Sequence, residues 1–375
     1  MLEFLTLKPE AFGLDISDLS LKIVKLKKRG RTLNLASFGE GEIKPGIIKG
    51  GEIKDEEKLA EIVKEAIKKV KGERLRTKYV VASLPEEKAF SQVIQMPIMP
   101  EEDLKSAVIY EAENYVPLPI EEVYFDSEIV PPVYDHLERL DVLISALPKK
   151  TVDPYLSSFK KAGLKPIAFA IESSAISRAL IKNQTTNYPV LIIDLGQTRT
   201  SFIIFAGKSV RFTSSIPVSG RNFTEIISKN LKTSLAEAER LKIKYGLEEK
   251  IKLKIEKDET IFKKEKGKIF EALIPALIDL VQQIKKCLDY YESHAQISGL
   301  PPDGRRIEKI FLCGGGANLK GLSELLSLEL KLPVEIGNPW INILGEKKEL
   351  PGLSFEESLK YTTAIGLALQ GISEK

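Results

Sequence analysis

The sequence is short of the side chains on which many active sites depend. Among its 375 residues there are two cysteines, Cys287 and Cys313, and two histidines, His136 and His294. Neither histidine has a cysteine or histidine neighbour at the spacing of zinc ligands, and both cysteines lie in apolar patterns that favour packing over a disulfide. We therefore expect neither a zinc centre nor a histidine-based catalytic triad.

Long apolar runs and an excess charge of one sign are also missing. The best candidate for a membrane span, residues 269–284, is broken by Glu271, Pro275 and Asp279, and a span needs about 20 apolar residues. Residues 1–9 lack the basic and apolar regions of a secretory signal. The 56 basic and 53 acidic residues leave a net charge of +3, so no overall field favours nucleic acid. We expect a cytoplasmic globular protein of two domains.

Two segments repeat one pattern, in which two runs of strand-forming residues flank a short turn that follows an aspartate. They are FGLDISDLSLKIVKL (Phe12 to Leu26) and PVLIIDLGQTRTSFIIF (Pro189 to Phe205), and their aspartates, Asp15 and Asp194, are 179 residues apart. Backbone N–H groups of a tight turn can hold phosphate oxygens, and a nearby carboxylate can hold a hydrated divalent cation. Either segment alone is also explained as an ordinary hairpin. Together they predict two related half-domains that grip a polyphosphate.

A third element, KIFLCGGGANLKGL (Lys309 to Leu322), carries a triple glycine. An apolar strand enters Gly314-Gly315-Gly316, and a helical pattern follows through Leu319, Leu322 and Leu325. Glycines at such a junction let a flat ligand lie against bare backbone, and a helix N-terminus favours anions. We expect a strand-to-helix turn that contacts a nucleotide.

In this order, the three elements resemble the actin-like ATPase superfamily over nearly the whole chain. The resemblance implies an α/β fold of duplicated actin-like (ribonuclease H-like) domains, with a cleft between two lobes and an inserted subdomain of the FtsA type. Residues 97–126, which read PxMPxxxLxxAVxxEAxxYxPxPxEEVxxD, and the AIGLAL of residues 364–369 are similar to the PilM family of type IV pilus assembly proteins. FtsA instead continues into a linker and an amphipathic membrane-binding helix.

The resemblance also divides the chain. It implies a first core subdomain of residues 1–79 with 148–188 and 340–375, and an inserted α/β subdomain of residues 80–147. A second core subdomain would comprise residues 189–212 with 269–339, and residues 213–268 would form its small lobe.

The cofactors that the resemblance implies are ATP and Mg²⁺, with the metal held through water by Asp15 and Asp194 facing each other. The nucleotide-binding residues carried over are Asp15, Ser17, Asp18, Leu19, Ser20 and Lys22 in the first hairpin, Asp194, Gly196, Gln197, Thr198, Arg199 and Thr200 in the second, and Gly220, Glu239, Lys242, Gly314, Gly315, Gly316, Ala317 and Asn318. Ser17 and Ser219 stand where the family usually has glycine.

Two of these assignments have alternatives. Glu239 and Lys242 share one face of an expected helix, Ser234 to Gly246, and a charged helix surface explains them as well as contact with ribose and adenine does. Hydrolysis needs a group that orients the attacking water, and Glu172, at the start of another expected helix, is the candidate. ATP binding is therefore predicted more firmly than ATP hydrolysis.

The function that follows from the resemblance is that of a cytoplasmic ATP-binding adaptor in the inner-membrane platform of a type IV pilus. The adaptor would bind the N-terminal tail of a PilN-like bitopic membrane protein between the first core subdomain and the insert, within residues 79–126, and nucleotide state would change this docking. PilN-like and other platform proteins would hold it at the inner membrane, and self-association is left open. An FtsA-like division protein and a small-molecule kinase of the same fold remain alternatives.

Overall fold

The computed structural model describes residues 10–30, 32–131, 139–247, 263–297, 306–344 and 352–373. The chain forms two compact units: the first contains residues 1–185 and 338–375, and the second contains residues 186–337. Each unit has its own central β-sheet. His136 and most of the lysine-rich part of the expected small lobe lie outside the described residues.

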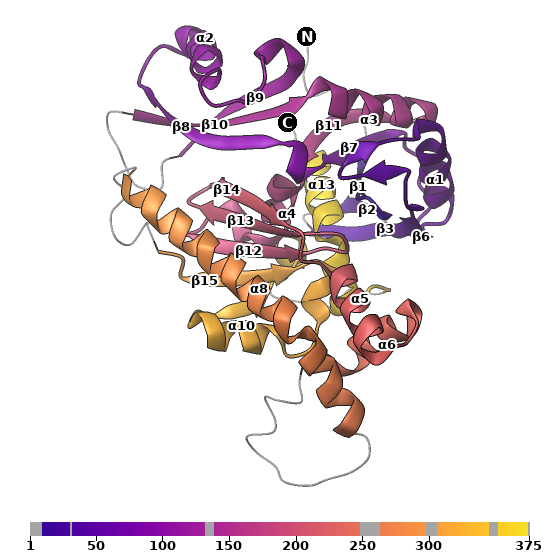
Figure 1. Ribbon diagram of the computed structural model, residues 1–375. Helices are drawn as coiled ribbons and strands as arrows, with labels where there is room; N and C mark the ends of the chain where they lie inside the picture. The colour runs from indigo at the N-terminus through magenta and orange to yellow at the C-terminus, as the bar shows by residue number, and fades with distance from the viewer. Residues whose placement is uncertain are drawn as a thin grey trace. The chain divides into compact units, whose positions relative to one another are not determined.

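The first unit is built on a six-stranded sheet with the order β11-β7-β1-β2-β3-β6 (Figure 1). Its strands are β1 (Ala11–Ile16), β2 (Ser20–Arg29), β3 (Thr32–Glu42), β6 (Lys71–Gly72), β7 (Tyr79–Leu84) and β11 (Lys165–Ile171). β1 is buried along its whole length. It pairs antiparallel with β2 and parallel with β7. Burial on both faces explains why this strand is a nearly continuous apolar run.

Helices cover both faces of this sheet. α1 (Glu56–Lys68) and α3 (Lys149–Lys161) share a core with Phe12 and Leu14 of β1. α4 (Glu172–Leu180), α11 (Ile341–Leu344) and α13 (Thr362–Ser373) pack with β2 and β7 in separate clusters. A Cβ on Gly366 of α13 would lie 1.8 Å from the carbonyl oxygen of Ala175 in α4. Glycine is therefore required for these two helices to approach so closely.

Between β7 and β11 the chain forms a separate three-stranded antiparallel sheet, which with its helix we call the insert (residues 90–148). Its order is β8-β10-β9, with β8 (Phe90–Pro97), β9 (Val123–Val130) and β10 (Arg139–Pro148). α2 (Glu101–Ala112) packs on it through Leu104, Val108 and Ala112, which recur every four residues. β10 runs directly into α3.

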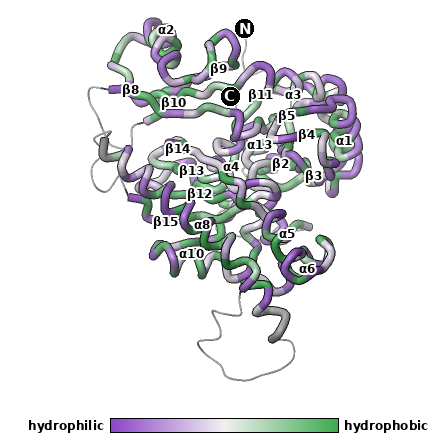
Figure 2. Tube along the Cα trace, viewed as in Figure 1, coloured by the Kyte–Doolittle hydropathy of each residue, from purple (hydrophilic) through white to green (hydrophobic). Residues whose placement is uncertain are grey.

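The second unit contains a five-stranded sheet with the order β14-β13-β12-β15-β16. The strands are β12 (Val190–Leu195), β13 (Thr200–Ala206), β14 (Ser209–Ile216), β15 (Lys309–Cys313) and β16 (Val334–Ile336). Figure 2 shows the central strands as largely hydrophobic, consistent with their burial. The helices are α5 (Gly220–Leu231), α6 (Leu235–Tyr245), α8 (Lys263–Ile297) and α10 (Leu322–Leu330), and α8 contacts the other three.

The two sheets repeat one topology. β3-β2-β1-β7-β11 in the first unit corresponds to β14-β13-β12-β15-β16 in the second, with an antiparallel hairpin first and a parallel neighbour beside it. Asp15 pairs with Lys22 in the first hairpin, and Asp194 pairs with Ser201 in the second. Both members of the second pair lie 179 residues after those of the first. The predicted duplication is therefore confirmed, while the four-part division stays a prediction.

Candidate functional site

Asp15 lies near the end of β1 and is 6% exposed. The hydroxyl of Ser83, in the neighbouring strand β7, donates to its Oδ1 at 3.0 Å, and Lys22 Nζ lies 4.0 Å from its Oδ2. Burial raises the pKa of Asp15, although Lys22 and the Ser83 hydrogen bond act in the opposite direction. A carboxylate that is so poorly solvated gains stability from a nearby cation.

Ser17 is folded into the turn that follows Asp15. Its N–H donates to the carbonyl oxygen of Ser20 at 2.9 Å, and its hydroxyl donates to the same oxygen at 3.0 Å. Lys22 Nζ donates to the Ser20 hydroxyl at 2.9 Å. The hydroxyl that distinguishes Ser17 from the family's glycine is thus used inside the turn.

Asp18 and Leu19 attach this turn to the chain that follows. The Asp18 carboxylate accepts the N–H groups of Gly50 at 2.8 Å and Gly51 at 2.9 Å, and the Leu19 carbonyl oxygen accepts the N–H of Ile43 at 2.9 Å. Gly50 and Gly51 join the short strands β4 (Ile48–Lys49) and β5 (Glu52–Ile53). Asp18 therefore holds the β4–β5 hairpin against the turn.

Asp194 occupies the corresponding position in the second unit. Gly196 N–H donates to the Arg199 carbonyl oxygen at 2.9 Å, as Ser17 does to Ser20. The Cys313 thiol, opposite Asp194 in β15, donates to Asp194 Oδ1 at 3.7 Å. Burial and the Asp194 charge raise the pKa of Cys313, so the thiol keeps its proton. Each aspartate thus has a small donor from the neighbouring parallel strand.

Sequence reasoning missed Ser83 and assigned Cys313 to packing. The signal that could have found them is that Cys313 is the last residue of an apolar strand and Ser83 the last but one, each next to the strand that carries the aspartate.

The turn after Asp194 is hydrogen-bonded to the first residues of α5. The N–H groups of Gly220 and Arg221 donate to the carbonyl oxygens of Gly196 at 3.0 Å and Gln197 at 3.1 Å. Thr200 is buried and donates to the Val218 carbonyl oxygen at 2.7 Å, whereas Gln197 is exposed and Thr198 is half-buried. The side chain of Ser219 accepts the N–H of Asn222 at 3.2 Å and so caps α5.

Glu239 and Lys242 of α6 belong to a hydrogen-bond network with α5. Lys242 Nζ lies 2.8 Å from both the Gly220 carbonyl oxygen and Thr224 Oγ1, and 2.7 Å from Glu239 Oε2. Thr224 Oγ1 also donates to Glu239 Oε2. An ammonium group has three donors, and these three contacts use them. Lys242 therefore ties α6 to the start of α5, whatever else it contacts.

The triple glycine packs against the end of β12. Gly314 has φ +79°, and a Cβ there would lie 2.3 Å from Asp194 Oδ1. Gly315 and Asn318 are exposed, whereas Ala317 is buried. A helix follows the glycines as expected, but residues 315–318 first form the 3₁₀ turn η5 and α10 begins only at Leu322, so Leu319 lies outside the helix. The surface at Gly315 is bare backbone, without an α-helix N-terminus.

Glu172 is the first residue of α4 and is half-buried. It follows β11, so it lies at the same carboxyl edge of the sheet as Asp15, two strands away, or roughly 10 Å. Sequence reasoning missed Glu86 at this edge, which is 5% exposed and accepts the Ser173 N–H at 2.9 Å through Oε2. Two carboxylates therefore lie at the start of α4.

The donor set suits magnesium better than zinc or calcium. Among the described residues, no three or more His, Cys, Asp or Glu side chains are grouped as metal ligands. Mg²⁺ is commonly bound by one or two carboxylates together with substrate phosphates, and single aspartates beside tight turns fit that use. That Asp15 and Asp194 share one ion stays a prediction.

The duplicated sheets and their paired aspartate turns define the actin-like ATPase fold. MreB5 of Spiroplasma citri bound to ADP has this fold, with a TM-score of 0.52 and 13% identity over 95% of this chain and 94% of that chain. The chain belongs to the PilM family, because the model for type IV pilus assembly protein PilM matches residues 13–372. A chain of a PilM–PilN type IV pilus biogenesis complex is 27% identical, with a TM-score of 0.76, over 98% of this chain and 100% of that chain.

Cell division protein FtsA is a more distant relative. The protein from Neisseria meningitidis is 29% identical over 217 residues, 56% of this chain and 49% of FtsA, and that from Streptococcus pneumoniae is 25% identical over 94% of this chain and 82% of FtsA. The chain thus spans about half the length of the first of these relatives. Within the described residues, none of the helices has the length and apolar character of a membrane span.

Proposed function

We propose that this protein is a cytoplasmic, ATP- and Mg²⁺-binding adaptor of a type IV pilus assembly platform, which binds the N-terminal cytoplasmic tail of a PilN-like membrane protein. The observation that carries the proposal is the agreement with a chain of the PilM–PilN complex over nearly the full length of both chains. PilN-like and other platform proteins would then hold the adaptor at the inner membrane.

Nucleotide binding is supported by the second unit's own residues. The Asp194 turn, the bare backbone at Gly315 and the Glu239–Lys242 pair all belong to this unit. Asp15 and its turn in the first unit are the corresponding phosphate and metal groups. When bound, Mg²⁺ would neutralise charge on the phosphates. Glu172 and Glu86 are the candidates to orient water, so binding is proposed more firmly than turnover.

Coupling between nucleotide and tail is supported by contacts within the first unit. Asp18 in the phosphate turn holds Gly50 and Gly51, and the Gly51 carbonyl oxygen accepts the Tyr155 hydroxyl of α3 at 3.0 Å. α3 follows β10 of the insert directly, and its Asp153 accepts the Tyr124 hydroxyl of β9 at 2.9 Å. A shift of the turn on nucleotide binding can therefore reach the insert through consecutive hydrogen bonds.

The proposal is tested by titrating the full chain with a synthetic peptide of the PilN-like tail, with ATP–Mg²⁺ present or absent, by isothermal titration calorimetry. We expect saturable binding of the tail peptide and none of a scrambled peptide. ATP–Mg²⁺ is expected to bind and to change the affinity for the tail. A chain that binds neither tail nor nucleotide contradicts the proposal.

An FtsA-like role is the second candidate, because FtsA proteins match much of the chain. That role predicts that the purified chain floats with liposomes without any partner. Flotation together with failure to bind the tail peptide would favour it. Transfer of the ATP γ-phosphoryl group to a sugar would instead indicate the kinase alternative.

A further inference from the structure

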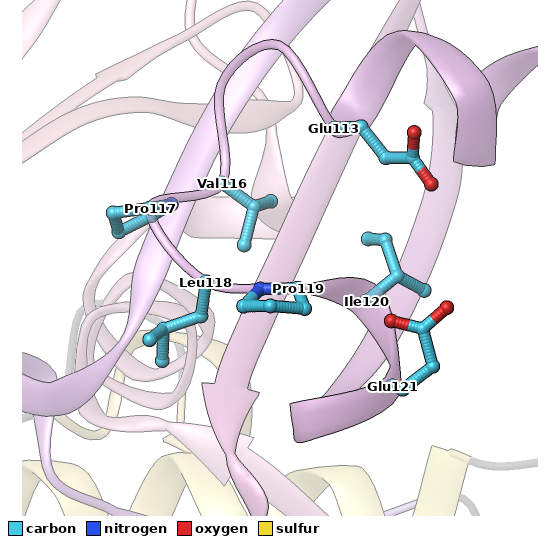
Figure 3. A pocket seen from close by; sticks show the side chains of 7 residues that line it. All are labelled: Glu113, Val116, Pro117, Leu118, Pro119, Ile120 and Glu121. Atoms are coloured by element: carbon cyan, nitrogen blue, oxygen red, sulfur yellow. The ribbon is translucent and has the colours of Figure 1, made fainter.

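The insert has a solvent-open hollow of about 500 Å³ between the end of α2 and the start of β9 (Figure 3). Its lining is Glu113, Val116, Pro117, Leu118, Pro119, Ile120 and Glu121. Val116 is buried, and Leu118 and Ile120 are half-buried against the core of the insert. The apolar residues of the lining therefore belong to the core of the insert or pack against it.

The backbone of this hollow has few N–H groups to offer a ligand. Pro117 and Pro119 have none, the Val116 N–H donates to the Ala112 carbonyl oxygen at 2.8 Å, and that of Glu122 donates to Pro119 at 2.9 Å. A ligand would therefore be recognised by the lining side chains rather than by strand pairing.

Those side chains are apolar or acidic. In Figure 3 the side chain of Ile120 lies between those of Glu113 and Glu121. Both glutamates are exposed, and neither forms an ion pair with any described residue. Their charge is part of a wider imbalance: residues 90–148 contain twelve acidic and two basic residues, although the whole chain has a net charge of +3. The insert is thus strongly acidic within a slightly basic protein.

The hollow lies at the end of the insert that joins the core of the first unit. Val123, two residues after Glu121, pairs with Pro148, the last residue of β10 before α3. Lys149 of α3 lies over the ring of Tyr124, the next residue of β9. The hollow is therefore within residues 79–126, where the tail is expected to bind, and adjoins the helix that carries Tyr155.

We infer that this hollow binds a basic residue of the PilN-like tail together with an adjacent apolar residue. The apolar side chain would contact Val116, Leu118 and Ile120, and the cation would lie beside one or both of the flanking glutamates, Glu113 and Glu121. This inference rests on the proposed function, and specifies the tail chemistry as apolar and positively charged. The same acidity disfavours direct contact of the insert with anionic lipid.

The test compares binding of the tail peptide to the wild-type chain and to the double variant Glu113→Gln/Glu121→Gln, which removes charge and keeps shape. We expect a loss of affinity of about 3- to 20-fold at low salt, the range for two exposed charge pairs. The difference should shrink as salt is raised. Glu128→Gln in β9 is the matched control, because it removes one exposed charge from the same insert outside the hollow.

Two further measurements complete the test. Replacing the basic residues of the tail peptide by glutamine should remove the difference between the wild type and the double variant. Equal binding by both proteins at every salt concentration overturns the inference and leaves the proposed function standing, whereas no binding to the wild type overturns both. Light scattering measures the oligomeric state of both proteins. If the double variant binds the tail peptide as the wild type does and differs only in oligomeric state, the hollow binds a second copy of the chain, and the inference is also overturned.

Discussion

At the scale of single residues, each candidate metal-binding aspartate depends on a small donor that is distant in the sequence. Ser83 reaches Asp15 across 68 residues, and Cys313 reaches Asp194 across 119. Groups that hydrogen-bond to a metal-binding carboxylate orient it, and their loss typically weakens metal binding by about 10- to 100-fold. Ser83 and Cys313 are therefore positioning residues in the proposed site.

Cys313→Ala tests this role, with Cys287→Ala as its match. Both substitutions remove a buried thiol, so each should lower the free energy of unfolding by about 1 kcal/mol. Only Cys313→Ala should weaken binding of ATP–Mg²⁺, by about 10-fold, because the Cys313 thiol donates to Asp194 whereas Cys287 lies in α8. Calorimetric titration measures the affinity and urea unfolding measures the stability. Equal affinities of the two variants would exclude the positioning role.

Gly314→Ala tests the close contact between the triple glycine and Asp194. The added Cβ would lie 2.3 Å from Asp194 Oδ1, so the substitution should destabilise by about 2–4 kcal/mol and displace the carboxylate. Gly163→Ala is the control, because Gly163 has φ +80° against +79° for Gly314 but has nothing within 4 Å. In the control, the free energy of unfolding should fall only by the backbone strain of a non-glycine residue at positive φ, about 1–2 kcal/mol. Thermal unfolding of both variants checks the difference, and similar losses would contradict the argument.

The Cys287 thiol should make stability depend on pH in the alkaline range. Burial raises the pKa of Cys287 to about 12 from its ordinary 9. Between these values the unfolded chain releases this proton and the folded chain keeps it, so stability falls as pH rises. Below pH 9 the contribution is constant. The advantage of the wild type over Cys287→Ala in unfolding free energy, about 1 kcal/mol below pH 9, should therefore vanish near about pH 10 and reverse by about pH 11, as measured by urea unfolding.

The aspartates and glycines were predictable at this scale, and their donors were not. Asp15, Asp194 and Gly314 stand out because they interrupt apolar strand patterns within a few residues. Ser83 and Cys313 become significant only when the pairing of β1 with β7 and of β12 with β15 is known. A local pattern carries no information on which distant strands pair.

At the scale of secondary structure, both hairpins and the helix that carries Glu239 and Lys242 agree with the sequence patterns. The helix expected after Gly314 is present but begins later than its pattern, because apolar residues at helical spacing, Leu319 and Leu322, fit a 3₁₀ turn followed by a separate helix equally well. The tie between α6 and α5 could not be predicted either. The sequence places Glu239 and Lys242 on one face without showing that Gly220 and Thr224 lie opposite.

Lys242→Met tests that tie. The substitution leaves the Gly220 carbonyl oxygen and Glu239 without their charged donor, so we expect a loss of about 1–3 kcal/mol in unfolding free energy. Arg240→Met, on the same helix, removes an exposed pair with Glu237 and should lower the free energy of unfolding much less, because solvent screens exposed pairs. If Lys242 also contacts nucleotide, saturating ATP will raise the melting temperature of Lys242→Met less than that of the wild type. Equal stabilities of the two variants would refute the tie.

At the scale of the whole molecule, the duplication explains why two weakly similar segments could be recognised. The two hairpins keep the same register around their aspartates although few residues are identical. The fold and the turn geometry constrain the pattern of apolar and polar residues more than they constrain the residue types. The insert interrupts the first copy between β7 and β11. It therefore adds a separate sheet and helix to the first copy without changing the order of its main sheet.

The connection between the Asp18 turn and the insert leads to a prediction for Tyr155→Phe. The variant loses the hydrogen bond to Gly51 and about 1 kcal/mol of stability, but it keeps the proposed nucleotide-binding residues and the hollow of the insert. We expect unchanged affinities for ATP–Mg²⁺ alone and for the tail alone. The factor by which each ligand changes the affinity for the other, typically about 5- to 150-fold in coupled systems, should fall towards 1.

Tyr110→Phe is the control. It alters a side chain that is 75% exposed on α2, and should keep the wild-type factor. Calorimetric titrations of each ligand with and without the other measure it in both directions, which must agree. A Tyr155→Phe factor equal to the wild type would show that coupling does not pass through this hydrogen bond.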